Sequence, residues 1–165
     1  TGRPEKAAMI RLFPRRCIAG RLAVAVLTIL AVSVACSSGD ARIEASQARA
    51  ADPVAGSSQI VITLTNVGER PDRLISASTP AAVDVQIHLT EIVEQRASMR
   101  SVDTVDLPTG TPVRFRPGGL HLMMVVPDET VVLGARFPLT LTFQHAAPIT
   151  VDVDVVPLDE LLEGS

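Results

Sequence analysis

The sequence predicts an all-β domain of about 115 residues behind an N-terminal leader. Short runs rich in β-branched residues recur along the chain, and clusters of proline and glycine separate them. No segment keeps the 3.6-residue period of an amphipathic helix, except a short stretch at residues 158–162. Eight or so strands at this spacing are typical of a β-sandwich or Greek-key barrel.

The predicted strands follow one another along this body. Residues 59–66 combine β-branched side chains with a near-alternation of apolar and polar positions, and they end in the turn Asn66-Val67-Gly68. Seven further runs have the same character, at residues 72–77, 83–94, 99–105, 112–116, 121–126, 137–144 and 149–156. Residues 36–58 are rich in Ala, Ser, Gly and Asp, which indicates a flexible tether that allows one short strand at 42–50. The predicted sandwich therefore covers residues 59–157, and a C-terminal tail covers 158–165.

The first 35 residues differ in charge from the rest of the chain. They hold six basic residues and one acidic residue, a balance of +5, so the remaining residues carry −8 of a total charge of −3. Arginines at positions 11–21 precede an uncharged run at residues 22–35. As a helix this run spans about 21 Å, less than the roughly 30 Å of a bilayer core. We interpret residues 1–35 as a signal peptide, with an uncleaved N-terminal membrane helix as the alternative.

The end of this run, Val34-Ala35-Cys36-Ser37-Ser38, resembles a lipoprotein processing site. A small residue precedes the cysteine, and a polar stretch follows it. We expect Cys36 to carry a lipid that anchors an exported protein to the outer face of the cell membrane. The alternative of free or disulfide-paired cysteines is weaker, because Cys17 lies in the basic segment with nothing foldable around it.

Composition argues against several classes of function. The chain has no Trp or Tyr for stacking on bases or sugars, and its acidic body does not favour a nucleic-acid partner. The dinucleotide-binding, P-loop, serine-hydrolase and zinc-protease motifs are all absent from the sequence. Asp152 and Asp154 alternate with valines and therefore belong to the solvated face of a strand, and Glu91 and Glu94 fall near a hairpin. We do not expect an enzyme.

Histidine and methionine are the remaining candidates for chemistry in the body. In the run His121-Leu122-Met123 the period of two places the imidazole and the thioether on one face, with Met124 on the other. His88 lies mid-strand, and a turn at residues 95–98 would bring the strand of Met99 beside it. Thioethers are soft ligands that select Cu(I), and unlike thiolates they survive in an oxidising compartment.

The spacing of these four residues, His88-x10-Met99-x21-His121-x-Met123, resembles the signature of the periplasmic copper chaperone PCu(A)C family. Neighbouring segments are also similar to that family, at residues 64–68, 71–74, 76–82 and 116–120. The resemblance covers residues 43–157 and identifies the chain as a lipoprotein-type member. It implies a cupredoxin-like β-sandwich that holds Cu(I) near its surface through His88, Met99, His121 and Met123.

The resemblance also implies a non-enzymatic carrier that passes Cu(I) to a copper-accepting protein. The expected recipients are a cytochrome c oxidase subunit, during assembly of the oxidase copper centre, or another copper chaperone. Family members often place a methionine or glutamate after the first histidine, where this chain has Leu89. Glu91 is a candidate acceptor for the second nitrogen of a metal-bound imidazole. His145 lies outside the signature, and we interpret it as an edge or loop residue.

Two other functions fit the composition less well. A cell-surface β-sandwich interaction module without metal would be favoured if His88 and Met99 lay more than about 10 Å from His121 and Met123, because metal–ligand bonds are only about 2.0–2.4 Å. A copper redox enzyme is disfavoured because the body has no cysteine for a blue-copper site and no Tyr or Trp for electron relay.

Overall fold

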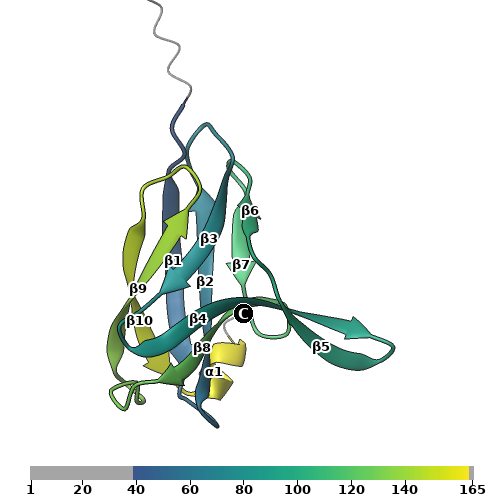
Figure 1. Ribbon diagram of the computed structural model, residues 1–165, viewed down its shortest axis with the longest axis vertical. Coiled ribbons are helices and arrows are strands. Elements are labelled where there is room, and N and C mark those ends of the chain that lie inside the picture. Colours follow the sequence, from purple (N-terminus) through teal and green to yellow (C-terminus); the bar gives the residue numbers. More distant parts are fainter. Residues whose placement is uncertain (1–38, 164–165) are drawn as a thin grey trace, which may run out of the picture. The chain divides into compact units, whose positions relative to one another are not determined.

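The computed structural model describes residues 39–163. The signal peptide, the lipidated Cys36 and the alternative membrane helix are predictions that lie outside the described residues. Within residues 39–163 no helix is both long and apolar enough to cross a membrane. This part of the chain forms strands that hydrogen-bond into one sheet, followed by a short helix (Figure 1). The predicted all-β class is confirmed.

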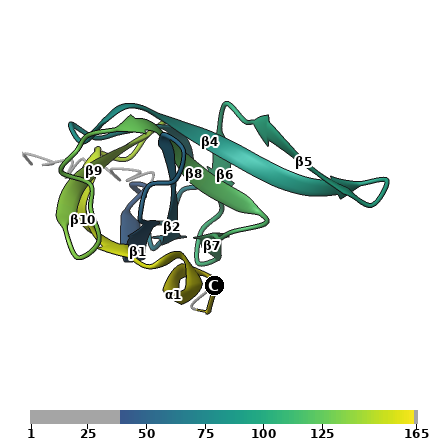
Figure 2. The ribbon, with the colours of Figure 1, turned by 90° about the horizontal axis from the view of Figure 1, so that it is seen from below.

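The elements follow the sequence pattern closely. The strands are β1 (Ile43–Ala51), β2 (Ser57–Asn66), β3 (Asp72–Ser78), β4 (Ala82–Val93), β5 (Arg96–Ser101), β6 (Val105–Leu107), β7 (Pro112–Phe115), β8 (Leu120–Pro127), β9 (Arg136–Phe143) and β10 (Ile149–Val156), and the helix is α1 (Leu158–Glu163). Neighbours in the sheet run β5-β4-β8-β2-β1-β10-β9-β3-β6, and β7 also pairs with β2. Seen end-on, β4, β8, β2, β1, β10 and β9 curl around a common interior (Figure 2).

The core lies inside this curled sheet. On β2 the alternate residues Ile60, Ile62 and Leu64 are fully buried, and Leu122 and Met124 of β8 join them in the same cluster. Burying side chains of this size stabilises the fold by roughly 1.5–3 kcal/mol each. The intervening residues of β2, β8 and β4 point to the opposite side, which we call the outer face: Gln59, Val61, Thr63, His121, Met123 and His88.

One predicted strand is wrong, because residues 99–105 divide between β5 and β6. β5 pairs with β4, and the backbone N–H of Val102 still donates to the carbonyl of Ile87 (2.9 Å). The chain then leaves β4, and β6 pairs with β3 at the other end of the sheet order. Both halves are strand-like in sequence, so residues 99–105 alone do not indicate that the chain changes its pairing partner from β4 to β3.

The strand that the sequence allows near residues 42–50 is β1, which lies inside the sheet. It pairs antiparallel with β2 and parallel with β10. Ala50 of this strand is fully buried in the core. After β10, α1 covers part of the outer face, where Leu161 is fully buried against Ala51 and Val61.

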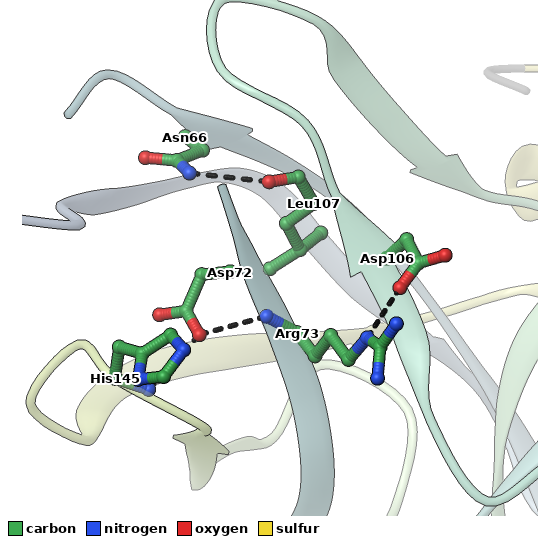
Figure 3. Close-up of polar contacts among 6 residues, drawn as sticks. All are labelled: Asn66, Asp72, Arg73, Asp106, Leu107 and His145. Carbon is green, nitrogen blue, oxygen red and sulfur yellow. Dashed lines mark hydrogen bonds and ion pairs between the residues drawn. The ribbon is translucent and has the colours of Figure 1, made fainter. Parts of the chain in front are cut away.

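A buried polar cluster joins the loops at one end of the sheet (Figure 3). The Asn66 amide donates to the carbonyls of Arg70 (2.7 Å) and Leu107 (3.1 Å). The Asp72 carboxylate accepts from the backbone N–H groups of Arg73, His145 and Ala146, at 2.7, 2.9 and 2.7 Å. His145 lies in the loop between β9 and β10, where it was expected. Asn66 and Asp72, which belong to segments that carry the family resemblance, therefore hold these loops together.

The β4–β5 hairpin projects from the body of the sheet (Figures 1 and 2). Residues 91–100 are all exposed. Val93 pairs with Arg96, so Glu94 and Gln95 form a two-residue turn, and both have positive φ, 48° and 64°. This is the pattern of a type I′ turn, which asparagine and glycine adopt at lower cost.

Replacing this turn with Asn-Gly, as Glu94→Asn with Gln95→Gly, is expected to stabilise the hairpin by about 1 kcal/mol per residue, because left-handed backbone is costly for most other residues. The new residues tolerate positive φ, so amide hydrogen exchange across β4 and β5 should slow. Ser98→Gly provides the opposite control, because glycine inside the extended β5 weakens a strand. Unchanged or faster exchange in the Asn-Gly variant would show that the positive φ of Glu94 and Gln95 does not destabilise the hairpin.

Candidate metal site

Two histidines from distant parts of the sequence meet on the outer face. His88 of β4 pairs in register with His121 of β8, so their side chains lie on the same side of the sheet. Their ring centroids are 5.8 Å apart, and the ring planes are nearly perpendicular, at 83°. Pairing of β4 with β8 thus creates a site with two imidazoles.

The turn before β8 sets the orientation of His121. Its ring is fully buried, and Nδ1 lies 2.9 Å from the carbonyl oxygen of Gly119. A carbonyl can only accept, so Nδ1 carries the proton and Nε2 keeps its lone pair. The same oxygen accepts the backbone N–H of Thr90 (3.0 Å), which ties the turn to β4.

A chain of side chains along β4 orients His88 in the same way. The amide nitrogen of Gln86 donates to the carboxylate of Asp84 (3.0 Å), which turns the amide oxygen toward His88. His88 Nε2 lies 3.0 Å from that oxygen and donates to it. The lone pair of His88 therefore remains on Nδ1.

These two lone-pair nitrogens have no partner. Within residues 39–163, His88 Nδ1 and His121 Nε2 are the only buried side-chain nitrogen or oxygen atoms without a hydrogen bond. Leaving a buried polar atom unsatisfied costs about 1–3 kcal/mol, so such atoms are rare and need an explanation. A cation between the strands would satisfy both lone pairs at once.

The surroundings of His88 favour its neutral form, which can bind a cation. Burial lowers the pKa of His88, and the neighbouring His121 lowers it further, because a charged imidazole would be poorly solvated and would repel a second positive charge. His88 is therefore neutral at physiological pH. A neutral imidazole is the form that binds a metal ion.

The methionines of the signature lie on the same face as the histidines. Met123 follows His121 by two residues and pairs with Gln86, whereas Met99 lies two residues before Ser101, the partner of His88. Met99 is 51% exposed on the hairpin, and Met123 is half-buried beside a hollow of about 150 Å³. Met124 is fully buried on the core side, as expected.

Residues 39–163 contain no group of three or more His, Cys, Asp or Glu side chains that could hold an ion. The thioethers of Met99 and Met123 lie on the same face as His88 and His121 and could add to the two imidazoles. That donor set suits a soft monovalent cation better than zinc, magnesium or calcium.

Sequence reasoning chose the wrong partner for the second imidazole nitrogen. Glu91 lies on the opposite face of β4 from His88, because their positions differ by an odd number, and it pairs with Arg100 (3.2 Å). The Gly119 carbonyl and the Gln86 amide orient the rings instead. The signal for Gln86 is its place two residues before His88, and that for Gly119 is the Pro-Gly-Gly turn before His121.

Comparison with known proteins points to one family. The model of the LpqE-like family matches residues 40–155. No curated protein matches the chain. The copper-bound PCuAC domain from PmoF2 is 26% identical, with a TM-score of 0.59, and the match covers 70% of this chain and 92% of that one. The apo PmoF2 PCuAC domain is 26% identical, with a TM-score of 0.60, over 73% and 94%.

A third solved structure shares the fold. The solution structure of Cu(I)-bound DR1885 from Deinococcus radiodurans is 22% identical, with a TM-score of 0.56. That match covers 70% of this chain and 77% of the other. The described sheet therefore has the architecture of PCuAC domains.

Proposed function

This chain belongs to the LpqE-like family, and from that membership we propose that it is an extracytoplasmic carrier of Cu(I). The observation that carries the proposal is the pair of buried, unpartnered imidazole nitrogens, His88 Nδ1 and His121 Nε2, on adjacent strands. With Met99 and Met123 on the same face, they would make a two-imidazole, two-thioether site. The similarity to a copper-bound PCuAC domain at 26% identity supports copper as the cargo.

The four proposed ligands differ in exposure, which suits a carrier. His121 is fully buried and held by Gly119, whereas Met99 is 51% exposed on the projecting hairpin. A ligand of the recipient protein can therefore replace the Met99 thioether first and the buried His121 last. Copper keeps its oxidation state throughout this exchange, so the transfer needs no redox partner and no catalysis by the chain.

The proposed recipient is a copper-accepting protein outside the cytoplasm, such as a cytochrome c oxidase subunit or another copper chaperone. The net charge of −8 after residue 35 favours capture of cations and approach to a basic partner, mainly through the association rate. We place the domain at the outer face of the cell membrane, held by a lipid on Cys36. In this proposal the fold is cupredoxin-like, with Greek-key connections.

A second candidate function rests on the exposed apolar residues of the hairpin. Ile92 and Val93 are 73% and 54% exposed, which is unusual for large aliphatic side chains and favours a protein-binding surface. A metal-free interaction module would use this surface without His88 and His121. Titration of the chain with Cu(I) against a competing chelator separates the two functions, because only the carrier binds one Cu(I) tightly.

Gln86→Ala is expected to lower Cu(I) affinity by about 10–100-fold, the usual effect of losing a residue that orients a ligand. Without the amide oxygen, Nε2 of His88 loses its acceptor and the ring is free to turn its lone pair away. The affinity would be measured by competition with a Cu(I) chelator. Gln144→Ala, at an exposed position on the β9–β10 loop, is the control and should leave affinity unchanged. Equal affinities for the two variants would argue against the assigned tautomer.

A further inference from the structure

Three arginines gather around a small hollow on the outer face. The hollow, of about 40 Å³, lies between β1, β2 and β7. Its lining consists of Arg49, Arg114 and Arg116, of Gln47 and Thr63, and of the apolar residues Val61, Ile62 and Phe115. We call this set the arginine pocket. Arg114 pairs in register with Thr63, and Arg116 follows directly after β7. The body outside the leader is acidic and has no lysine, and three of its nine arginines line this hollow.

The protein leaves most of this charge uncompensated. Arg49 is the most buried of the three, with its side chain 24% exposed, and its guanidinium lies 3.6 Å from the Glu160 carboxylate. In the described part of the chain neither Arg114 nor Arg116 has a carboxylate within 4.0 Å. Three guanidiniums and one carboxylate leave a charge of about +2 around the hollow. Holding like charges together costs free energy unless an anion joins them.

The backbone of β1 is distorted at the rim of the same hollow. The register between β1 and β2 shifts between Ser46 and Arg49, and Gln47 in this bulge has φ of 56°, which non-glycine residues rarely adopt. The Thr63 hydroxyl donates to the side-chain oxygen of Gln47 (3.4 Å), which leaves the amide N–H groups free to donate. β-Bulges commonly re-aim a side chain next to a functional site. Here the bulge supplies a neutral donor beside the arginines.

We propose that the arginine pocket binds a phosphate group. The charge matches, because a phosphate monoester or inorganic phosphate carries about −1.5 to −2 at pH 7. The hollow gives the phosphate oxygens a place between the guanidinium groups. Guanidinium groups bind phosphate oxygens in pairs, and the Gln47 amide can donate to a further oxygen.

Calorimetric titration of the full chain with inorganic phosphate tests this proposal. We expect one phosphate per chain, and the double variant Arg114→Gln with Arg116→Gln should weaken binding at least 10-fold. Arg96→Gln, at an exposed position on the hairpin, is the control for loss of an arginine outside the pocket and should bind as the parent does. Absence of saturable binding to the parent, or an equal loss in Arg96→Gln, would overturn the proposal. Circular dichroism spectra verify that each variant is folded.

Gln47→Gly separates a binding role from a structural one. Glycine tolerates the positive φ, so the melting temperature should rise, while the loss of the amide donor should weaken phosphate binding. A variant that is more stable and binds phosphate as tightly as the parent would overturn the role of Gln47 in the pocket.

Vesicles identify the source of the phosphate group. If the parent sediments with phosphatidic acid vesicles and the double arginine variant does not, the pocket binds a lipid headgroup. Binding of inorganic phosphate without sedimentation would assign it to the free ion. Phosphatidylcholine vesicles are the control, because choline balances the charge of the phosphate in this headgroup, and the parent should not sediment with them.

Discussion

His121→Ala is expected to lower the Cu(I) affinity of the chain by more than about 100-fold, which exceeds the usual effect of losing an orienting residue. The substitution removes the buried Nε2 lone pair, one of two that have no hydrogen-bond partner in residues 39–163. It also removes the ring that packs against His88 at 5.8 Å. Affinity would be measured by competition with a Cu(I) chelator on folded protein. His145→Ala is the control, because His145 lies in the β9–β10 loop beside Arg70, and it should bind copper as the parent does.

A pair of conservative methionine variants makes the test sharper. Leucine has nearly the volume of methionine but no sulfur, so Met123→Leu removes a thioether with little effect on packing. Met124→Leu makes the same chemical change one residue along, on the core side of β8. We expect only Met123→Leu to weaken Cu(I) binding, although the core variant is the one expected to lose more stability. If both variants bind Cu(I) as the parent does, Met123 is not a ligand, and if both weaken it equally, the effect comes from packing.

Asp72→Asn is expected to give the largest loss of stability among single polar substitutions, about 3 kcal/mol. The Asp72 carboxylate is buried and accepts three backbone N–H groups, two of which, from His145 and Ala146, connect β3 with the β9–β10 loop. Asparagine replaces one acceptor oxygen with an NH2 group. At least one of the three backbone N–H groups then faces another donor and loses its hydrogen bond. Urea unfolding measures the change. Asp106→Asn is the matched control, because Asp106 is exposed and its ion pair with Arg73 (2.6 Å) should contribute less than about 1 kcal/mol.

The Asp72 carboxylate also makes the stability of the fold depend on pH in the acidic range. Burial by itself would raise the pKa of Asp72, but hydrogen bonds from Ala146, Arg73 and His145 and the charge of His145 outweigh it, so the pKa lies below its ordinary value of 3.8. A lowered pKa in the folded state contributes stability that is present above pH 3.8 and is lost as the pH falls through the folded value. The difference between the parent and Asp72→Asn should therefore shrink in acid. A constant difference from pH 7 down to pH 2 would contradict this linkage.

The sequence by itself determined the all-β class, most strand positions and the separation of the two methionines of β8 to opposite faces. These are local properties, because the period of two in a strand decides the face of each side chain. The four ligand candidates His88, Met99, His121 and Met123 come from the resemblance of their spacing to the PCu(A)C signature, and we propose the same four from the structure. The leader and Cys36 remain predictions from sequence alone.

Tertiary structure decided what depends on contacts between distant segments. Pairing of β4 with β8 places His88 opposite His121, 33 positions away, and the division of residues 99–105 between two sheet edges depends on partners that the run does not encode. The acceptors on Gln86 and Gly119, the unpartnered ring nitrogens and the arginine pocket likewise appear only in the fold. The physical reason is that hydrogen bonding and burial depend on where side chains meet in space, which strand periodicity does not specify.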